Sequence, residues 1–324
     1  MVRQASKWTV VAYLVVVIFV AFITLYSARC LINRPWTARD QVAAIAIGGK
    51  IYVLGGRDRE GLCDEIFQID PVQRRLRVVA HLPSARYGMG VTALQGRIYA
   101  LGGYDGRYLD EIVEIDPQAG RMQVIGRLPT PRAYGGAAAF RGKLYFIGGW
   151  DGQHRLDEIV EIDPSTGKPL VVGHLPSPRE FPAVVALHGR LYAIGGEGEQ
   201  GEYLDEIVEF DPSQGKILRV GKLSSARARG AAGSVGGKIY LIGGWAGKPL
   251  DEIIVIDPSP QEITAQVLNH LPKGRADLGL ASMDDKLYLI GGADEIFERQ
   301  IAILELDPAT GRVRSLRMRS FLWW

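Results

Sequence analysis

Cysteine and histidine are scarce in this chain of 324 residues. There are two cysteines, Cys30 and Cys63, and five histidines, which do not cluster with the cysteines at the spacing of metal ligands. We therefore expect no metal site and no cofactor. Cys30 follows a long apolar run and Cys63 lies in an expected loop, so a disulfide between them is not expected. The cysteines therefore do not indicate whether the chain is in an oxidising or a reducing compartment.

An excess of one charge is also missing. Lys and Arg number 38 against 36 Asp and Glu, a formal net charge of +2, and 47% of the residues are apolar. The first 34 residues hold four basic residues and no acid, which leaves 34 basic against 36 acidic residues in the remainder. Nucleic-acid binders concentrate Lys and Arg on one face, so this balance argues against nucleic acid as a partner. The apolar content and the few low-complexity runs instead predict a folded chain with a large core.

One long run without charge is present, at residues 8–28, bounded by Lys7 and Arg29. As a helix with a rise of about 1.5 Å per residue it would span roughly 30 Å, the thickness of the hydrocarbon layer. A cleaved signal peptide is the alternative, but its apolar region is usually only about 7–15 residues long and ends in small residues. Here the bulky Tyr26 lies where a small residue is needed. We therefore expect an uncleaved signal-anchor helix that crosses a membrane once.

The orientation of this helix across the membrane is only weakly indicated by the sequence, because basic residues flank the helix on both sides. Short N-terminal tails usually stay in the cytoplasm, which places residues 1–7 there. A tether of residues 29–38 would then lead to a domain on the extracytoplasmic side.

A motif recurs six times along the rest of the chain, with a period of 46–48 residues. Each copy has an Arg and, thirteen residues later, a Tyr in an apolar run that ends in Gly-Gly. A loop, a strand that ends in Asp-Pro and a last strand follow, and in five copies the Asp-Pro strand begins with Asp-Glu-Ile. The six pairs are Arg39 and Tyr52, Arg86 and Tyr99, Arg132 and Tyr145, Arg179 and Tyr192, Arg227 and Tyr240, and Arg275 and Tyr288.

Each copy predicts one four-stranded blade. Its first strand is rich in small residues, as expected where several blades crowd around one axis. Gly-Gly suits a turn that a Cβ would obstruct, and Asp-Pro-x-x-Gly suits a hairpin turn. The sequence therefore predicts an all-β, six-bladed β-propeller.

These repeats resemble the kelch family over residues 39–319, and an aromatic tail, residues 320–324, follows them. The Trp that is usual in the outer strand of kelch repeats is replaced by Leu76, Met122, Leu170, Ile217, Ile263 and Val313. The blades are expected at roughly 39–85, 86–131, 132–178, 179–226, 227–274 and 275–319.

Two blades are irregular. Blade 5 has two extra residues after Pro258, which we expect to form a bulge in its outer strand. In blade 6, counting back from Asp307 puts Ala302 where the other blades have the Glu of Asp-Glu-Ile, so Asp294 belongs to a loop. Because the chain starts with an inner strand and ends with an outer one, we expect no strand exchange between the two ends, and ring closure by side-chain packing.

The resemblance implies that ligands bind on the face formed by the loops before the inner strand and after Gly-Gly. The residue two positions after the repeated Arg differs in every blade, whereas a scaffold needs repetition, so this position is a candidate for recognition. Aromatic rings among a few charges suit a sugar, a peptide or an anionic small molecule, and a merely solvated rim is the alternative. The predicted ligand-binding rim comprises Gln41, Tyr104, Tyr134, Trp150, Phe181, Arg229, Trp245, Arg275 and Asp277.

The repeated arginines are expected to pair with the Glu of Asp-Glu-Ile and so to lock the blades, rather than to form a ring that binds anions. Arg275 lacks such a Glu and is expected to be free to bind. Among the histidines, His81, His174 and His270 occupy a repeated surface position. His154, beside Asp151, is a weak candidate for a general base.

We therefore expect a monomeric, membrane-anchored propeller that binds a protein or a small carbohydrate or anionic ligand. An enzyme is the weaker expectation and no catalytic residue is assigned. The motifs of galactose oxidase-like, nitrile-specifier-like and sialidase-like proteins are absent. An N-acetylneuraminate epimerase-like isomerase that uses Arg229, Asp277 and Glu197 is the leading enzymatic alternative. An inward-facing acid of raised pKa beside an available Arg would favour chemistry, and a broad flat face would favour a protein partner.

Overall fold

A computed structural model describes residues 36–294, 298–300 and 302–318. The chain divides into two units, Met1–Thr37 and Ala38–Trp324, and all the described strands lie in the second. The predicted membrane helix at 8–28 and the aromatic tail at 320–324 lie outside the described residues. Within the described part of the chain, no helix is long and apolar enough to cross a membrane.

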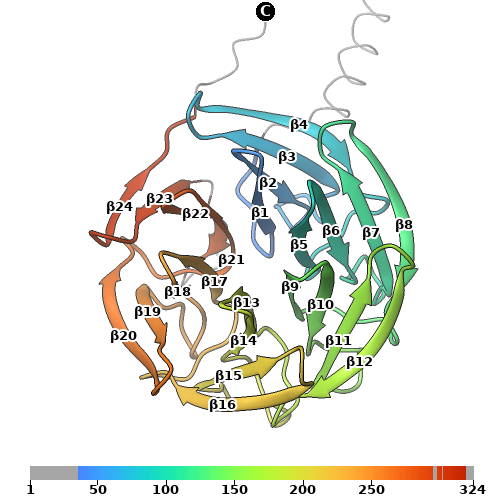
Figure 1. Ribbon diagram of the computed structural model, residues 1–324. Helices are drawn as coiled ribbons and strands as arrows, with labels where there is room; N and C mark the ends of the chain where they lie inside the picture. Colours follow the sequence, from blue (N-terminus) through green and yellow to red (C-terminus); the bar gives the residue numbers. More distant parts are fainter. Residues whose placement is uncertain (1–35, 295–297, 301, 319–324) are drawn as a thin grey trace, which may run out of the picture. The chain divides into compact units, whose positions relative to one another are not determined.

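The second unit is a ring of six antiparallel sheets around a central axis, each made of four consecutive strands (Figure 1). This confirms the all-β, six-bladed propeller, and among the described strands none is exchanged between blades. In chain order the strands are β1 Ala43–Ile47, β2 Lys50–Leu54, β3 Glu65–Asp70 and β4 Arg75–His81; β5 Gly90–Leu94, β6 Arg97–Leu101, β7 Glu111–Asp116 and β8 Arg121–Arg127; β9 Gly136–Phe140, β10 Lys143–Ile147, β11 Glu158–Asp163 and β12 Lys168–His174; β13 Ala183–Leu187, β14 Arg190–Ile194, β15 Glu206–Asp211 and β16 Lys216–Lys222; β17 Ala231–Val235, β18 Lys238–Ile242, β19 Glu252–Pro258 and β20 Ile263–His270; β21 Ala276–Met283, β22 Lys286–Ala293, β23 Ile303–Asp307 and β24 Arg312–Ser315.

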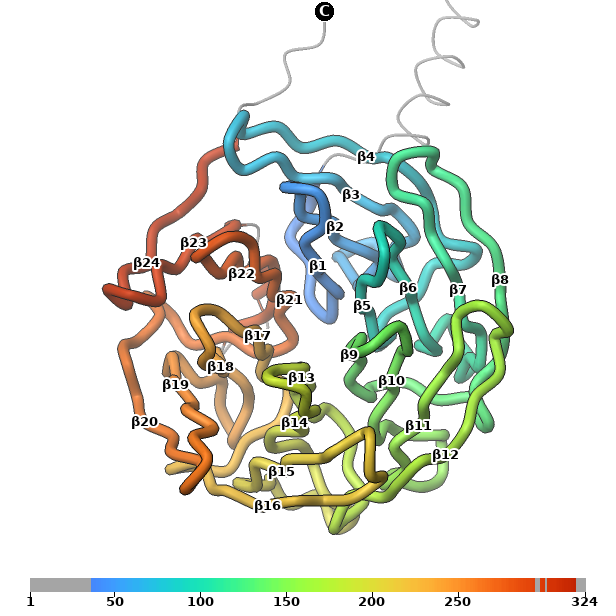
Figure 2. Tube along the Cα trace, viewed as in Figure 1, coloured from blue at the N-terminus to red at the C-terminus, as the bar shows by residue number. Residues whose placement is uncertain are grey.

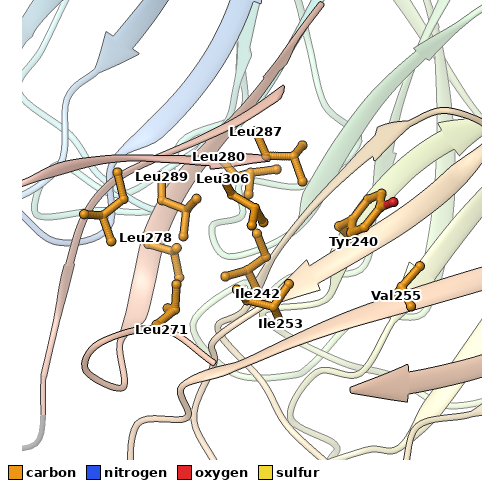
Figure 3. Packing of buried hydrophobic residues seen from close by; sticks show 11 residues of the cluster. Tyr240, Ile242, Ile253, Val255, Leu271, Leu278, Leu280, Leu287, Leu289 and Leu306 are labelled. Atoms are coloured by element: carbon orange, nitrogen blue, oxygen red, sulfur yellow. The ribbon is translucent and has the colours of Figure 1, made fainter. Parts of the chain in front are cut away.

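The hydrophobic core lies between neighbouring blades. In Figure 3, Ile242 and Ile253 of blade 5 lie among Leu278, Leu280 and Leu287 of blade 6. The first strand of each blade lines the axis (Figure 2), next to the first strands of the neighbouring blades. A Cβ added to Gly233 on β17 would lie 2.4 Å from Leu280 Cδ2, which explains why small residues prevail in these strands.

Ring closure between blades 6 and 1 uses the backbone as well as side chains. The Gln41 N–H donates to Asp277 O at 2.8 Å, and the Gly292 N–H donates to Arg39 O at 2.8 Å. The expectation of closure by side-chain packing alone is therefore wrong. The physical reason is that the loop that enters each inner strand crosses the preceding blade and bonds to its Gly-Gly turn, at this seam as at the others.

The two extra residues of blade 5 do not form a separate bulge. They add one cross-strand pair, Pro258 with Ile263, to the hairpin of β19 and β20. A register shift does occur between Ile253 and Ile254, but blades 1 to 3 have a shift at the corresponding place, and blade 4 has one two residues further along, between Glu209 and Phe210. The bulge is thus a feature of the repeat, and the extra residues lengthen the hairpin.

The repeated arginines tie neighbouring blades together. Arg179 is fully buried, and its Nη2 lies 2.5 Å from Glu206 Oε2 of its own blade 4. Its backbone bonds to blade 3, where it accepts from Gly149 N–H at 2.9 Å and donates to Leu156 O at 3.1 Å. The expected pairing with Glu is confirmed in five blades: Arg39 with Glu65, Arg86 with Glu111, Arg132 with Glu158, Arg179 with Glu206, and Arg227 with Glu252.

Candidate functional site

The loop face carries three paired backbone positions in each blade. They are the residue after the repeated Arg, the residue after Gly-Gly, and the residue two places before the third-strand Asp or its equivalent. The backbone pairing repeats, but no two blades carry the same three side chains. The sets are Asp40, Arg57 and Leu62; Tyr87, Tyr104 and Tyr108; Ala133, Trp150 and Arg155; Glu180, Glu197 and Tyr203; Ala228, Trp245 and Pro249; Ala276, Ala293 and Arg299.

A second ring lies closer to the axis, at the position two residues after the repeated Arg. Its six members have φ values between 52° and 65°, in the left-handed region, although only one of them is Gly. Backbone hydrogen bonds link them from blade to blade, for example from Tyr134 N–H to Gly88 O and from Phe181 N–H to Tyr134 O. Residues other than Gly that are held in the left-handed region are strained, and such residues cluster at functional sites. The ring consists of Gln41, Gly88, Tyr134, Phe181, Arg229 and Asp277.

This axial ring surrounds a cavity of about 170 Å³ at the mouth of the propeller. The Arg229 guanidinium lies 4.0 Å above the centre of the Phe181 ring, which in turn packs 4.4 Å from the ring of Tyr134. Arg229 Nη1 lies 3.4 Å from Asp277 Oδ2, a long hydrogen bond. Among the described residues, Asp277 is the one side chain that accepts a hydrogen bond from Arg229, so the remaining N–H groups of this guanidinium are available to a ligand.

Asp277 is a perturbed acid. Burial raises its pKa to about 6, because the charged form loses hydration, and the nearby Asp40 adds to the effect. Arg229 and Arg57 act in the opposite direction but do not cancel it. A carboxyl group that titrates near neutral pH beside an available guanidinium is an arrangement typical of functional sites.

A second cavity, of about 220 Å³, lies off the axis over blades 4 to 6 and shares Arg229 and Asp277 with the first. Blade 6 has only Ala276 and Ala293 at two of its paired positions, and every other blade carries a large side chain at the second of them, the residue after Gly-Gly. We call this second cavity the off-axis hollow; its remaining lining residues, among those that the structure describes, are Glu197, Tyr203, Trp245 and Asp294.

A closed ion cluster borders the hollow. Arg155 Nη2 lies 2.8 Å from Glu180 Oε1 and 2.7 Å from Glu197 Oε1. Burial raises the pKa of Glu180. The Arg155 guanidinium also lies 5.3 Å from the centre of the Trp150 ring. Because this Arg is shared by two carboxylates, the cluster shapes the wall of the hollow rather than offering a free cation.

The structure places most of the predicted rim residues on the loop face. Gln41, Tyr134, Phe181, Arg229 and Asp277 line the axial mouth, and Trp245 lines the off-axis hollow. Tyr104 and Trp150 lie in the paired loops.

Arg275 differs from the prediction. It is 4% exposed and its Nη1 donates to Gly291 O at 3.3 Å, in the same buried slot as the other five repeated arginines. Burial lowers its pKa, and the charge of Asp294 partly offsets that effect. The expectation that Arg275 is free to bind is therefore wrong, because its backbone position buries it whether or not a Glu faces it.

The histidines lie at exposed positions. His154 is 66% exposed, with its Nδ1 3.7 Å from Asp151 Oδ2, and lines neither cavity. His81, His174 and His270 each face an Asp at the outer edge of a blade, with Nδ1 to Oδ1 distances of 3.1, 2.9 and 3.0 Å.

The described residues include neither a candidate metal site nor a reactive thiol. No group of three or more His, Cys, Asp and Glu side chains that could hold a metal is found in residues 36–294, 298–300 and 302–318. Cys63 is buried, and burial raises the pKa of its thiol to about 12, so the reactive thiolate is suppressed.

Sequence reasoning missed Tyr87, Tyr108, Glu180 and Tyr203. A signal was available, because the residue after the repeated Arg and the residue two places before the Asp of Asp-Glu-Ile also vary among the blades. The role of Ala276 was not detectable in this way, because a small residue contributes a cavity only where its neighbours in space are large.

Comparison with known proteins agrees with this architecture. Residues 121–292 match the family described as the KLHDC2/KLHL20/DRC7 Kelch-repeats domain, and residues 38–80 and 85–121 match the Kelch motif. The solved structure of YjhT superposes with a TM-score of 0.75 at 16% sequence identity, covering 87% of this chain and 99% of that one. No curated protein matches the sequence significantly. The first match alone covers more than half of the sequence, so the chain belongs to the kelch-repeat family.

Proposed function

We propose that this chain is a membrane-anchored kelch propeller that binds a small carbohydrate or anionic ligand at the axial mouth and the off-axis hollow. The observation that carries the proposal is the exposure of the Arg229 guanidinium and its position between the two cavities. The repeated arginines are buried in the scaffold, whereas the Arg229 side chain is 29% exposed, lies over the Phe181 ring and lines both cavities. A guanidinium held in this way presents a planar fork that suits a carboxylate.

The off-axis hollow complements this anion site. Trp245 and Tyr203 offer ring surfaces for the apolar face of a sugar ring, and the Glu197 carboxylate, which pairs with Arg155 through Oε1, can accept from a sugar hydroxyl group through its other oxygen. A cavity of about 220 Å³ suits a small molecule or a single side chain rather than a whole protein surface.

The test is a screen of neutral sugars, sugar acids and small carboxylates against the full-length chain, by thermal shift and then by calorimetry. We expect a sugar acid to bind, and Arg229→Gln to weaken it about tenfold to a hundredfold, since hydrogen bonds to a charged group are lost. Arg229→Lys should rescue little, because an ammonium group lacks the fork.

Arg141→Gln is the matched control for this screen. Its guanidinium also lies over a Phe ring, 5.0 Å from the centre of Phe140, but in the β9 to β10 turn at the opposite end of the propeller. Equal loss in both variants, or no binding by any small molecule, would refute the proposal and direct attention to a protein ligand.

Proton-transfer chemistry on a bound sugar is a second candidate function, and the raised pKa of Asp277 beside Arg229 favours it. An isomerase of this kind needs an acid or base that exchanges a proton near neutral pH. The sugar acids of the screen, N-acetylneuraminate included, can be followed by NMR for interconversion of their anomers. Acceleration that is lost in Asp277→Asn would establish an enzyme, and an unchanged rate would leave a binding module.

The membrane anchor is proposed from sequence, on the uncharged run at residues 8–28, with the propeller on the extracytoplasmic side. We expect the full-length chain to resist alkaline extraction from membranes and a variant without residues 8–28 to be released. Protease added to intact cells should then reach the propeller. Release of the full-length chain by alkali would contradict the anchor, and protection from protease would reverse its direction.

A further inference from the structure

A row of aromatic rings crosses the loop face from the edge of blade 2 to the axis. Tyr108 packs 5.1 Å from Tyr104, Tyr104 lies 5.6 Å from Tyr87, and Tyr87 lies 6.0 Å from Tyr134, measured between ring centres. The last step, from Tyr134 to Phe181, is 4.4 Å. All five rings are partly exposed. We call this row the aromatic ladder.

The fold does not require the aromatic ladder. Tyr87, Tyr104 and Tyr108 occupy the three paired positions of blade 2, and the corresponding positions elsewhere hold residues as different as Asp, Arg, Ala and Pro. The backbone pairing is the same in all these blades. Three partly exposed tyrosines at positions where the side chain varies among the blades are therefore a property of the surface.

The aromatic ladder ends at the proposed ligand site. Its inner rings, Tyr134 and Phe181, line the axial mouth, and Arg229 lies on Phe181 and opens into the off-axis hollow on the far side. We propose that the ligand is an oligosaccharide, whose anionic end unit lies at Arg229 and whose following units lie along the aromatic ladder. This rests on the proposed function, because it extends the same site outward by several sugar units.

Two observations favour a sugar chain over a protein on the aromatic ladder. The spacing of the rings is close to the repeat of pyranose units in an extended chain, so successive units can lie along the row and contact it through their C–H groups. The described residues with exposed large aliphatic side chains all lie on outer strands or on one hairpin, away from this face: Val72, Val124, Leu170, Leu218, Val220, Val267 and Leu268. A protein interface would normally have an apolar core at its centre.

The test is calorimetry on the full-length chain with galacturonate oligomers of increasing length, beginning with the monomer, and with neutral cello-oligosaccharides of matched length. We expect the affinity of the wild type for the acidic series to rise about tenfold with length, since each ring contributes a stacking contact. Tyr104→Ala/Tyr108→Ala should lose this gain and keep the affinity for the monomer. Tyr104→Phe/Tyr108→Phe should keep the gain, because the rings remain.

Leu170→Ser, on an outer strand, is the matched surface control and should behave as the wild type. An affinity that does not change with length, or a gain that survives removal of both rings, would overturn the inference. Failure of the proposed function looks different: the neutral series would then bind along the aromatic ladder while Arg229→Gln changed nothing. If neither series binds and a protein is held through the same tyrosines, the oligosaccharide proposal is wrong.

Discussion

Glu206→Ala is expected to lower the free energy of unfolding by about 3 to 5 kcal/mol, because it leaves the Arg179 guanidinium charged, buried and without its carboxylate. Arg179 is fully buried, and its other partners, Ser177 and Gly195, supply only neutral oxygens. Glu206 itself is 28% exposed, so the penalty arises on the Arg side of the pair.

The measurement is chemical denaturation of the full-length chain, with Glu199→Ala as the control. Glu199 is exposed in the same blade, and its replacement should change stability by no more than about 0.5 kcal/mol. Arg179→Met/Glu206→Ala should cost less than the sum of the single changes, since no lone charge remains. A loss below about 1 kcal/mol for Glu206→Ala would mean that the pair behaves like a surface salt bridge and that the blades are held by other contacts.

Asp277→Asn is expected to stabilise the chain at pH 8 by about 3 kcal/mol and to have little effect at pH 4. The pKa of Asp277 in the folded state, about 6, lies above its ordinary value of 3.8. The folded state therefore holds its proton more tightly than the unfolded state, and stability falls as pH rises from about 4 through about 6. Asn resembles the neutral acid and removes this dependence.

Thermal unfolding of the wild type and Asp277→Asn between pH 4 and 8 checks this result. Asp284→Asn, at an exposed turn of the same blade, is the control and should leave the pH profile unchanged. Loss of the charge near Arg229 should also strengthen binding of sugar acids as the pH falls from 8 to 5. If Asp277→Asn destabilises the chain at pH 8, the ion pair with Arg229 outweighs the cost of burial, and the pKa of Asp277 cannot be raised.

Most of the scaffold was predictable because each blade is built from local signals. The interval of thirteen residues between the repeated Arg and the Tyr places one residue in the loop before an inner strand and the other on the next strand, and six copies predict six blades. The pairing of five arginines with Glu followed from the same repetition. Blade 5 shows the limit of such counting, since the place where two extra residues are accommodated depends on cross-strand pairing that the count does not include.

The candidate site was predictable only in part. Arg229 and Asp277 were identified because the residue two places after the repeated Arg differs in every blade. They lie 48 residues apart, however, and their contact depends on the left-handed backbone of the axial ring. Arg275 was misplaced because the absence of a facing Glu suggested a free charge, whereas the backbone buries that position in every blade.

By itself, the sequence determined the number of blades, the turns and the buried ion pairs, because these depend on residues within one repeat or between adjoining repeats. Only the tertiary structure decided how the six different loop sets combine. The axial ring brings Arg229 beside Asp277, the alanines of blade 6 open the off-axis hollow next to Trp245 of blade 5, and the tyrosines of blade 2 continue into the axial mouth. The physical reason is that a cavity or a stack depends on the relative sizes of side chains that meet across blades, and no single repeat contains that information.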